Sequence, residues 1–536
     1  MPKIWRLFSS TERRIFGAAL IAFLISLIFL STNFYYEKTI ERPASGGHYT
    51  EGSVGQPIFI NPLLALTNEI DRDLVEIIYS NLIELTESQQ LGSNNRFWTI
   101  TLKPNLQWAD GQPLTADDVV FTIAVIQNSA DHPSSAVWQG VTAEKINDNE
   151  VRLSLKTPYV FFSDHLQELK IAPKHIFGSI PPANLRLSRY NLEPVGSGAY
   201  QFAGLKIEKD GFITDYQLAR NPAYHGPPPY LDKVNFKFYR RPEELIDVFN
   251  KKEIDGLGGL DQKLTNQLKV GRQIISIALP RYYAIFFNPL TNKALKDKRV
   301  RTALDLATNK EQLAKQIFNN QTVLVNGPLP PNIEGYDRAV YQTAGFDLKA
   351  AVTLLDASGW TSGKDGVRIK LDIIVPQVAF LVETVNLIKE DWQKVGVELN
   401  PLIVNSSEIN EAIKTRGYQL LIFGNSLKKS PDVFSFWHSL EKSHPGRNLA
   451  LYENKNVDRL LEAIRQDFNN HSRQQKLTEL QRKIYEDRPA IFLFSPNYLY
   501  VLSRNLRGFS SYFITAPAER FNKIDQWHLK TNRVLN

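Results

Sequence analysis

The chain has 536 residues, which is too long for a single hydrophobic core and suits roughly three domains. Its contents of 43% hydrophobic and 22% charged residues are ordinary for a globular protein. The absence of cysteine excludes disulfides, thiolate metal sites, a cysteine nucleophile and lipid attachment to an N-terminal cysteine. The net charge of +7 contains no block of like charges, so we expect no nucleic-acid partner.

The first segment predicts a membrane anchor. Residues 15–36 carry no charge, and about 20 apolar residues span a bilayer. Basic residues precede this run and Tyr35 and Tyr36 close it, which predicts a cytoplasmic N-terminus and an extracytoplasmic body. A cleaved signal peptide is the alternative, but no small-residue cleavage pattern directly follows the run. We therefore expect a single-pass helix at the cell membrane, followed by a short tether.

Three acids lie close together in the stretch from Arg96 to Ile126: Asp110, Asp117 and Asp118. The alternating segment FWTITL predicts a strand, and Asp110-Gly111 is a strong turn signal. Thr115 and Asp118 then have the spacing of a capping box before the apolar run VVFTIAVI. We interpret the acids as a turn and a helix start, not as a metal or catalytic site.

The rest of the chain alternates between helical and strand patterns. Residues 300 to 425 carry both in succession, which predicts an α/β domain. Two amphipathic helices and a return to a sheet follow before residue 503.

Catalytic and phosphate-binding motifs are absent from the sequence. DGLGGL (255–260) lacks a following capped helix, and His438 and His444 do not have a helical ligand spacing. We therefore expect neither an enzyme nor a metal or other cofactor.

One loop combines aromatic and polar residues directly after a buried strand pattern. Loops at this position of α/β sheets commonly bind ligands. The predicted ligand-binding residues, all within GNSLKKSPDVFSFWHS, are Asn425, Lys429, Asp432, Phe434, Trp437 and His438. The alternative is that Phe434 and Trp437 fill a domain core.

The stretch FWTITLKPNLQWADGQPLTADDVVFTI, which starts at Phe97 and contains the three acids, resembles the signature of the family 5 extracellular solute-binding proteins, the oligopeptide- and dipeptide-binding proteins of ABC transporters. Further matches follow in chain order between residues 50 and 500, among them IAPKHIFG, PVGSGAYQF, ARNPAYHGPPPYLDKVNF and LYENKNVDRLLEAIR. The resemblance implies a mixed α/β chain with the type II periplasmic-binding fold. In that fold two lobes close on a ligand by a hinge, and an extra domain is added.

Applied to this chain, the resemblance implies crossovers between the lobes near Tyr282–Asn288 and Arg488–Phe494. The expected division is 1–14 basic N-terminus, 15–36 transmembrane anchor, 37–47 tether, 48–90 lobe I, 91–190 extra domain, 191–281 lobe I, 282–490 lobe II and 491–536 lobe I.

The family resemblance also exposes a departure. Peptide-binding members usually carry an Asp just before the Pro-Asp of the loop, where it pairs with the ligand's α-amino group, whereas this chain has Lys429. Either Asp432 takes over the amine, or the ligand lacks a free amine there.

The function expected from the resemblance is capture of a peptide or peptide-like ligand for an ABC permease by a monomer anchored in the lipid bilayer. The alternative is a ligand-sensing or scaffolding protein on the same fold that feeds no transporter.

Overall fold

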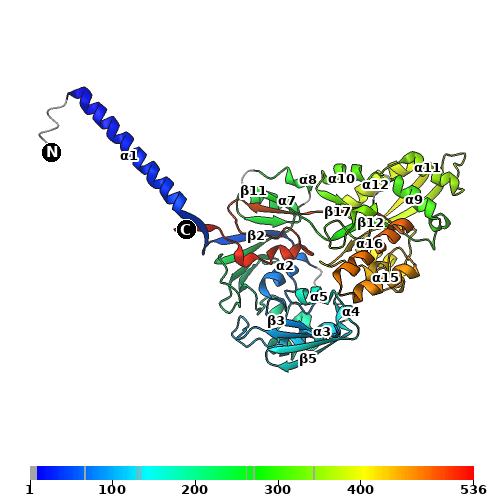
Figure 1. Ribbon diagram of the computed structural model, residues 1–536, viewed down its shortest axis with the longest axis horizontal. Coiled ribbons are helices and arrows are strands. Elements are labelled where there is room, and N and C mark those ends of the chain that lie inside the picture. The colour runs from blue at the N-terminus through cyan, green and yellow to red at the C-terminus, as the bar shows by residue number, and fades with distance from the viewer. Residues whose placement is uncertain are drawn as a thin grey trace.

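The computed structural model describes residues 9–64, 68–129, 132, 134–260, 262–269, 272–341 and 345–535. Its body contains three large sheets, and a long helix, α1, extends away from that body (Figure 1). We name the three parts by their sheets: lobe I has seven strands, the extra domain four and lobe II six.

Lobe I is built from both ends of the body. Its strand order is β11-β18-β10-β2-β9-β8-β7, so β18 from near the end of the chain lies between β11 and β10. The strands are β2 (His48–Val54), β7 (Tyr200–Ile207), β8 (Ile213–Arg220), β9 (Lys233–Tyr239), β10 (Gly256–Gly258), β11 (Arg272–Ile277) and β18 (Tyr498–Ser503). The helices are α2 (Glu69–Ile78), η2 (Pro182–Leu187), η3 (Arg189–Asn191), α7 (Pro242–Asn250), α8 (Gln262–Thr265), η7 (Pro517–Phe521) and η8 (Ile524–Gln526).

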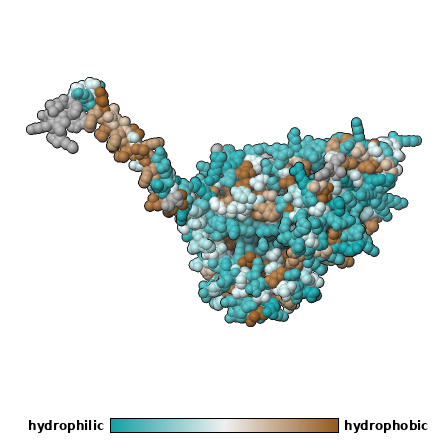
Figure 2. All heavy atoms as spheres, in the orientation of Figure 1, coloured by the Kyte–Doolittle hydropathy of each residue, from teal (hydrophilic) through white to brown (hydrophobic). Residues whose placement is uncertain are grey.

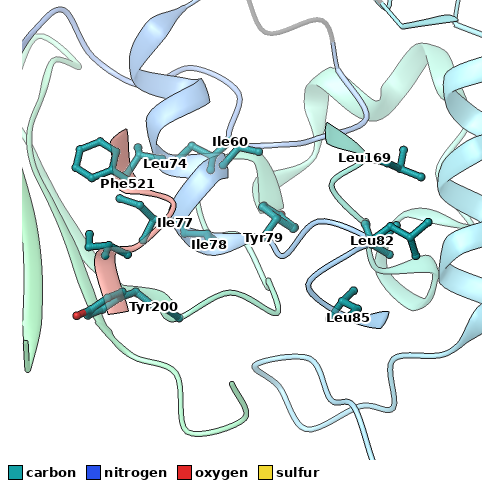
Figure 3. Close-up of a cluster of buried hydrophobic side chains, with 14 of the residues drawn as sticks. Ile60, Leu74, Ile77, Ile78, Tyr79, Leu82, Leu85, Leu169, Tyr200 and Phe521 are labelled. Atoms are coloured by element: carbon teal, nitrogen blue, oxygen red, sulfur yellow. The ribbon is translucent and has the colours of Figure 1, made fainter. Parts of the chain in front are cut away.

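Helix α2 packs its apolar face into lobe I. Leu74 and Ile77 are buried beside Phe521 of η7, and the same cluster continues toward Leu82 and Leu169 (Figure 3). Burial of such side chains contributes on the order of 1.5–3 kcal/mol each. The cluster fixes η7 against α2, and both elements border the pocket described below.

The extra domain confirms the predicted strand at Phe97–Leu102 and the predicted helix start at Thr115 and Asp118. Its sheet has the order β3-β4-β6-β5, with β3 (Thr86–Leu91), β4 (Phe97–Leu102), β5 (Val141–Asn147) and β6 (Glu150–Leu155). Its helices are α3 (Ala116–Gln127), α4 (Ser135–Trp138), α5 (Phe162–Glu168) and α6 (Lys174–Phe177). Trp98, Ile100 and Leu102 point inward from β4, as their alternation predicts. Thr115 caps α3 in a capping box with Asp118.

Lobe II has the α/β character predicted for residues 300–425. Its strand order is β13-β17-β12-β16-β14-β15, and β14 runs parallel to both of its neighbours. The strands are β12 (Arg281–Phe287), β13 (Thr322–Leu324), β14 (Ile369–Pro376), β15 (Val397–Val404), β16 (Leu420–Ser426) and β17 (Ala490–Pro496). The helices are η4 (Lys293–Lys296), α9 (Lys298–Leu306), α10 (Lys310–Phe318), η5 (Arg338–Tyr341), α11 (Leu348–Ala357), α12 (Ala379–Gln393), α13 (Ser406–Thr415), α14 (Phe434–Trp437), η6 (Ser439–Lys442), α15 (Lys455–Gln466) and α16 (Asn470–Asp487).

The chain passes between lobes I and II at two short connections. Residues 278–280 join β11 to β12, and Asn497 alone joins β17 to β18. The expected boundary after residue 490 therefore falls inside β17, whose pairs all lie in the lobe II sheet. In the sequence, residues 490–503 form a single apolar run. In the structure, β17 of that run belongs to the lobe II sheet and β18 to the lobe I sheet.

Helix α1 (Ser10–Lys38) covers the predicted span and none of its residues is buried. Figure 2 shows apolar residues along most of its exposed length. It is the one helix among the described residues with the length and composition to cross a membrane. The expected tether is corrected, because α1 continues through Lys38 and β1 (Thr39–Ala44) then pairs antiparallel with β19 (Lys530–Leu535).

Candidate ligand-binding site

A pocket of about 570 Å³ lies where lobe I, the extra domain and lobe II meet. Arg72 and Glu76 reach it from α2, and Asp164 and Glu168 from α5. Lobe II contributes the loop after β16, and residues 515–522 close another side. Its volume falls within the roughly 300–1,000 Å³ of small-molecule sites. All three parts of the body therefore contribute to its walls.

Lys429 is the predicted site residue that lines this pocket. Its side chain is exposed and forms no hydrogen bond or ion pair with any described residue. The neighbouring Lys428 also lines the pocket but is paired with Glu168 of α5. Of the two lysines in the loop, Lys429 is therefore the one with a positive charge available to a ligand.

The pocket wall also carries carboxylates. Glu76 forms an ion pair with Lys170 at 2.8 Å, whereas Glu84 and Glu519 form no ion pair with a described residue. Burial raises the pKa of Asp164 even though the backbone amide of Ser430 donates to it. The wall can thus interact with both signs of charge on a ligand.

Asp432 belongs to a cluster that joins lobe II to the extra domain, which we call the interdomain charge cluster (Tyr159, Asp432 and Arg465). The Tyr159 hydroxyl donates to Asp432 Oδ2 at 2.6 Å, and Arg465 Nη2 contacts the same oxygen at 2.9 Å. Arg465 Nε lies 3.0 Å from Oδ1, which also accepts from the amide of Phe434 at 3.2 Å. Both oxygens are occupied within the protein, so Asp432 has little capacity left for a ligand amine.

His165 of α5 lies against this cluster. Its ring stacks on Tyr159 with centroids 5.8 Å apart. Burial lowers the pKa of His165 to about 4, and the positive charges of Lys428 and Arg465 act in the same direction. The imidazole is therefore neutral at physiological pH.

Trp437 lies in the core of lobe II. It is 0% exposed and packs on Phe286 and Phe492, with ring centroids 6.2 and 5.6 Å apart. This is the location that the core-filling alternative describes. A contact between Trp437 and a ligand stays an untested prediction.

The remaining predicted residues, Asn425, Phe434 and His438, pack beside the loop after β16 and do not line the pocket. Asn425 is buried and donates to the Tyr282 hydroxyl at 3.0 Å. His438 is buried, stacks on Phe434 at 4.1 Å and lies 3.3 Å from Glu462. The guanidinium of Arg465 lies 3.9 Å from the centroid of the Phe434 ring. The predicted residues thus divide between one in the pocket and five in the packing next to it.

Most pocket residues were absent from the sequence prediction. Examples are Glu76, Asp164, Glu168 and Glu519, which come from three segments of the chain, the last more than 300 residues after the other two. In the sequence each is an ordinary polar residue of a helix or turn. Their shared position depends on how the domains pack, for which the sequence carries no local signal.

Three linked α/β and α+β units, two lobe crossovers and a pocket between the units define a solute-binding protein of the periplasmic-binding fold. The model of the family described as bacterial extracellular solute-binding proteins, family 5 Middle, matches residues 83–447. This match spans more than half of the chain, and the chain belongs to that family. It is therefore a solute-binding protein and not an enzyme.

The relatives agree with this assignment. The oligopeptide-binding protein AppA of Bacillus subtilis is 27% identical over 526 residues, covering 93% of this chain and 94% of AppA. The structure of B. subtilis AppA with a nonapeptide superimposes with a TM-score of 0.73 at 25% identity, covering 91% of this chain and 100% of that one. The fold is also shared with the substrate-binding protein CtaP of Listeria monocytogenes, with a TM-score of 0.78, 23% identity and coverage of 90% and 99%.

Proposed function

We propose that this protein is anchored in the membrane by α1, captures a peptide or peptide-like ligand outside the cytoplasm, and delivers it to an ABC permease. The observation that carries the proposal is the pocket, whose walls come from both lobes and the extra domain. A ligand there contacts all three units at once, so it favours the arrangement in which they are closed together. The similarity to AppA, which was solved with a nonapeptide, supports a peptide-like ligand.

The charges of the pocket support a ligand with its negative group near Lys429. Arg465 offsets the charge of Asp432 and the Tyr159 hydroxyl donates to it, so Asp432 has little capacity left to bind an amine. Lys429 attracts a carboxylate and repels an ammonium group. Glu84, which forms no ion pair with a described residue, is the proposed contact for a positive group on the same ligand. Asn425, Phe434, Trp437 and His438 are proposed to hold the loop in shape.

The test is a ligand-dependent shift in melting temperature of the full chain in lipid nanodiscs. A panel of peptides of two to nine residues, each free, N-acetylated or C-amidated, is the probe. A ligand at 100 times its Kd stabilises the folded protein by about 2.7 kcal/mol. We expect free and N-acetylated peptides to raise the melting temperature more than C-amidated ones, because Lys429 interacts with a carboxylate.

Charge reversal at the loop separates pocket binding from general effects. Lys429→Glu should weaken binding of carboxylate ligands about tenfold, which corresponds to 1.4 kcal/mol. Lys349→Glu changes the same charge on the exposed face of α11 and should leave binding unchanged. A panel that shifts the melting temperature of neither wild type nor variant would end the transport proposal. Capture of sensor or cell-wall proteins without a permease would instead favour the sensing alternative.

A further inference from the structure

The residues between α1 and the body form a hydrogen-bonded ribbon instead of a free linker. Strand β1 pairs with β19 over six consecutive positions, from Thr39↔Leu535 to Ala44↔Lys530. The two strands are separated by almost the whole chain, and Figure 1 shows the C-terminal end beside the base of α1. Because β19 pairs with no other strand of the described sheets, β1 supplies its complete ladder.

Arg533 of β19 closes the end of α1. Its Nε donates to Thr39 Oγ1 at 2.9 Å, and its Nη2 donates to the carbonyl oxygens of Tyr36 and Thr39 at 3.2 and 3.1 Å. The guanidinium also lies 4.3 Å from the centroid of the Tyr36 ring. The last carbonyls of a helix lack partners within it, and a cation favours that end of the helix dipole. A residue of the last strand thus caps the helix that begins the described chain.

The ribbon is in turn attached to lobe I. Glu41 of β1 forms an ion pair with Arg507 at 2.7 Å, and the backbones of Arg507 and His528 exchange two hydrogen bonds of 3.0 Å. Beyond β1, Gly46 donates to Tyr230 O at 2.7 Å before β2 enters the seven-stranded sheet. Hydrogen bonds and ion pairs therefore connect the last turn of α1 to lobe I. Ser45 alone separates the end of the β1–β19 ladder at Ala44 from the hydrogen bond of Gly46 to lobe I.

We propose that the β1–β19 ribbon is a mount that keeps α1 as a retained part of the folded protein and holds the solute-binding body in one orientation on the membrane. This inference rests on the proposed membrane anchor. An eleven-residue flexible linker has a root-mean-square span of roughly 18 Å and lets the body rotate freely. The ribbon removes that freedom, so the binding pocket faces its membrane partner in a constant geometry.

The position of the ribbon fits the membrane surface. The 29 residues of α1 extend roughly 43 Å, enough for the hydrocarbon core and a headgroup layer. Strand β1 begins at Thr39, three positions after Tyr36, and Tyr35 and Tyr36 are the residues expected at the interface. The exposed apolar side chains Ile40, Val534 and Leu535 lie at this helix-proximal end of the ribbon.

Hydrogen exchange of the full chain in nanodiscs tests the mount. The amides that bond across the ribbon, about every second one in residues 39–44 and 530–535 and none at Pro43, should exchange roughly tenfold or more slowly than in an unstructured peptide, because the ladder must open before exchange. Arg533→Ala should accelerate exchange in both strands together. Arg459→Ala, on the exposed face of α15, is the matched control and should change neither. Exchange of wild-type residues 39–44 at the unstructured rate would overturn the proposal.

A mass measurement tests retention of the helix. In protein extracted from the native membrane, residues 10–38 should still be attached to the body, so the measured mass should be that of a chain that includes α1. A shorter product that begins after α1 would overturn both the mount and the anchor while leaving peptide binding open. The ligand-dependent melting shift should be the same in wild type and Arg533→Ala. If neither wild type nor Arg533→Ala showed a melting shift with ligand, while the ribbon amides were still protected from exchange, the transport proposal would be contradicted and the mount would stand.

Discussion

Two clusters in this protein pair an arginine with carboxylate side chains, but the two differ in how far their side chains are exposed to solvent. In the first, Arg520 contacts Asp73 at 2.6 Å and Glu51 at 3.0 Å, and the three side chains are 2%, 5% and 0% exposed. We call these residues the lobe I charge cluster. The second is the interdomain charge cluster, in which the side chains of Arg465 and Asp432 are 32% and 12% exposed.

The difference lies in what each cluster joins. The lobe I charge cluster connects β2, α2 and η7, all within one lobe. The interdomain charge cluster connects α15 and the loop after β16 to the extra domain, beside the pocket. Interactions within a lobe stabilise its fold, whereas interactions between domains also bias how the domains are arranged. Similar chemistry therefore has different consequences at the two places.

The largest effect is expected for Arg520→Ala. It leaves Asp73 and Glu51 buried without a positive partner, which costs about 3–5 kcal/mol. Thermal unfolding should show the loss in lobe I. Arg507→Ala, whose side chain is 57% exposed, is the control and should cost far less. An Arg520→Ala protein as stable as the Arg465→Gln protein described below would remove the distinction between the clusters.

Trp437→Ala should lower stability by a similar amount, about 3–5 kcal/mol, because it opens a cavity in the lobe II core. The measurement is the melting temperature of the ligand-free protein. Phe97→Ala, at a 41% exposed aromatic residue of β4, is the control. If Trp437→Ala weakened peptide binding and left the melting temperature unchanged, the ligand-contact interpretation would replace the core interpretation.

Acidification should affect the clusters in opposite directions. The pKa of His165 is lowered to about 4 by burial, so the unfolded chain takes up the proton first as pH falls. The contribution of His165 to the free energy of unfolding is fully present above about pH 6.5 and decreases as the pH falls toward 4. At pH 5 the decrease is on the order of 1–2 kcal/mol. His165→Gln should flatten this slope in melting curves recorded from pH 7 to 5.

Asp73 has the opposite sign. Burial raises its pKa to about 6, although Arg520 opposes that shift. Between pH 6 and pH 4, Asp73 is protonated in the folded protein but still ionised in the unfolded chain. The contribution of Asp73 to stability therefore increases as the pH falls from 6 toward 4. Asp73→Asn should remove this gain. If His165→Gln and Asp73→Asn changed the pH slope in the same direction, the assignment of the two shifts would be contradicted.

The smallest stability effect is expected for Arg465→Gln, about 0–1 kcal/mol, because its ion pair is partly solvated. Its effect should appear instead in domain arrangement, as a larger radius of gyration by solution scattering and a faster ligand off-rate. Lys370→Gln removes a lysine from the exposed pair with Glu398 and provides the control. An unchanged ligand off-rate would mean that the interdomain charge cluster does not influence how the domains close around the pocket.

Local patterns determined several features correctly. The capping box at Thr115 and Asp118, the inward face of β4 and the span of α1 each depend on neighbours within a few residues. Such signals survive in the sequence because helix caps and strand alternation are set by short-range geometry. The family motifs are likewise continuous segments, and they fixed the class of protein.

Only the tertiary structure decided which part of the loop after β16 lines the pocket. Lys429 and Trp437 are eight positions apart in one aromatic and polar segment, yet one lines the pocket and the other is buried in the lobe II core. The pairing of β1 with β19 was equally invisible, because neither short strand carries a signal for a partner nearly 500 residues away. The sequence by itself determined the membrane-spanning pattern, the local elements and the family. Contacts between distant segments decided the pocket and the mount, because they depend on packing that no local pattern encodes.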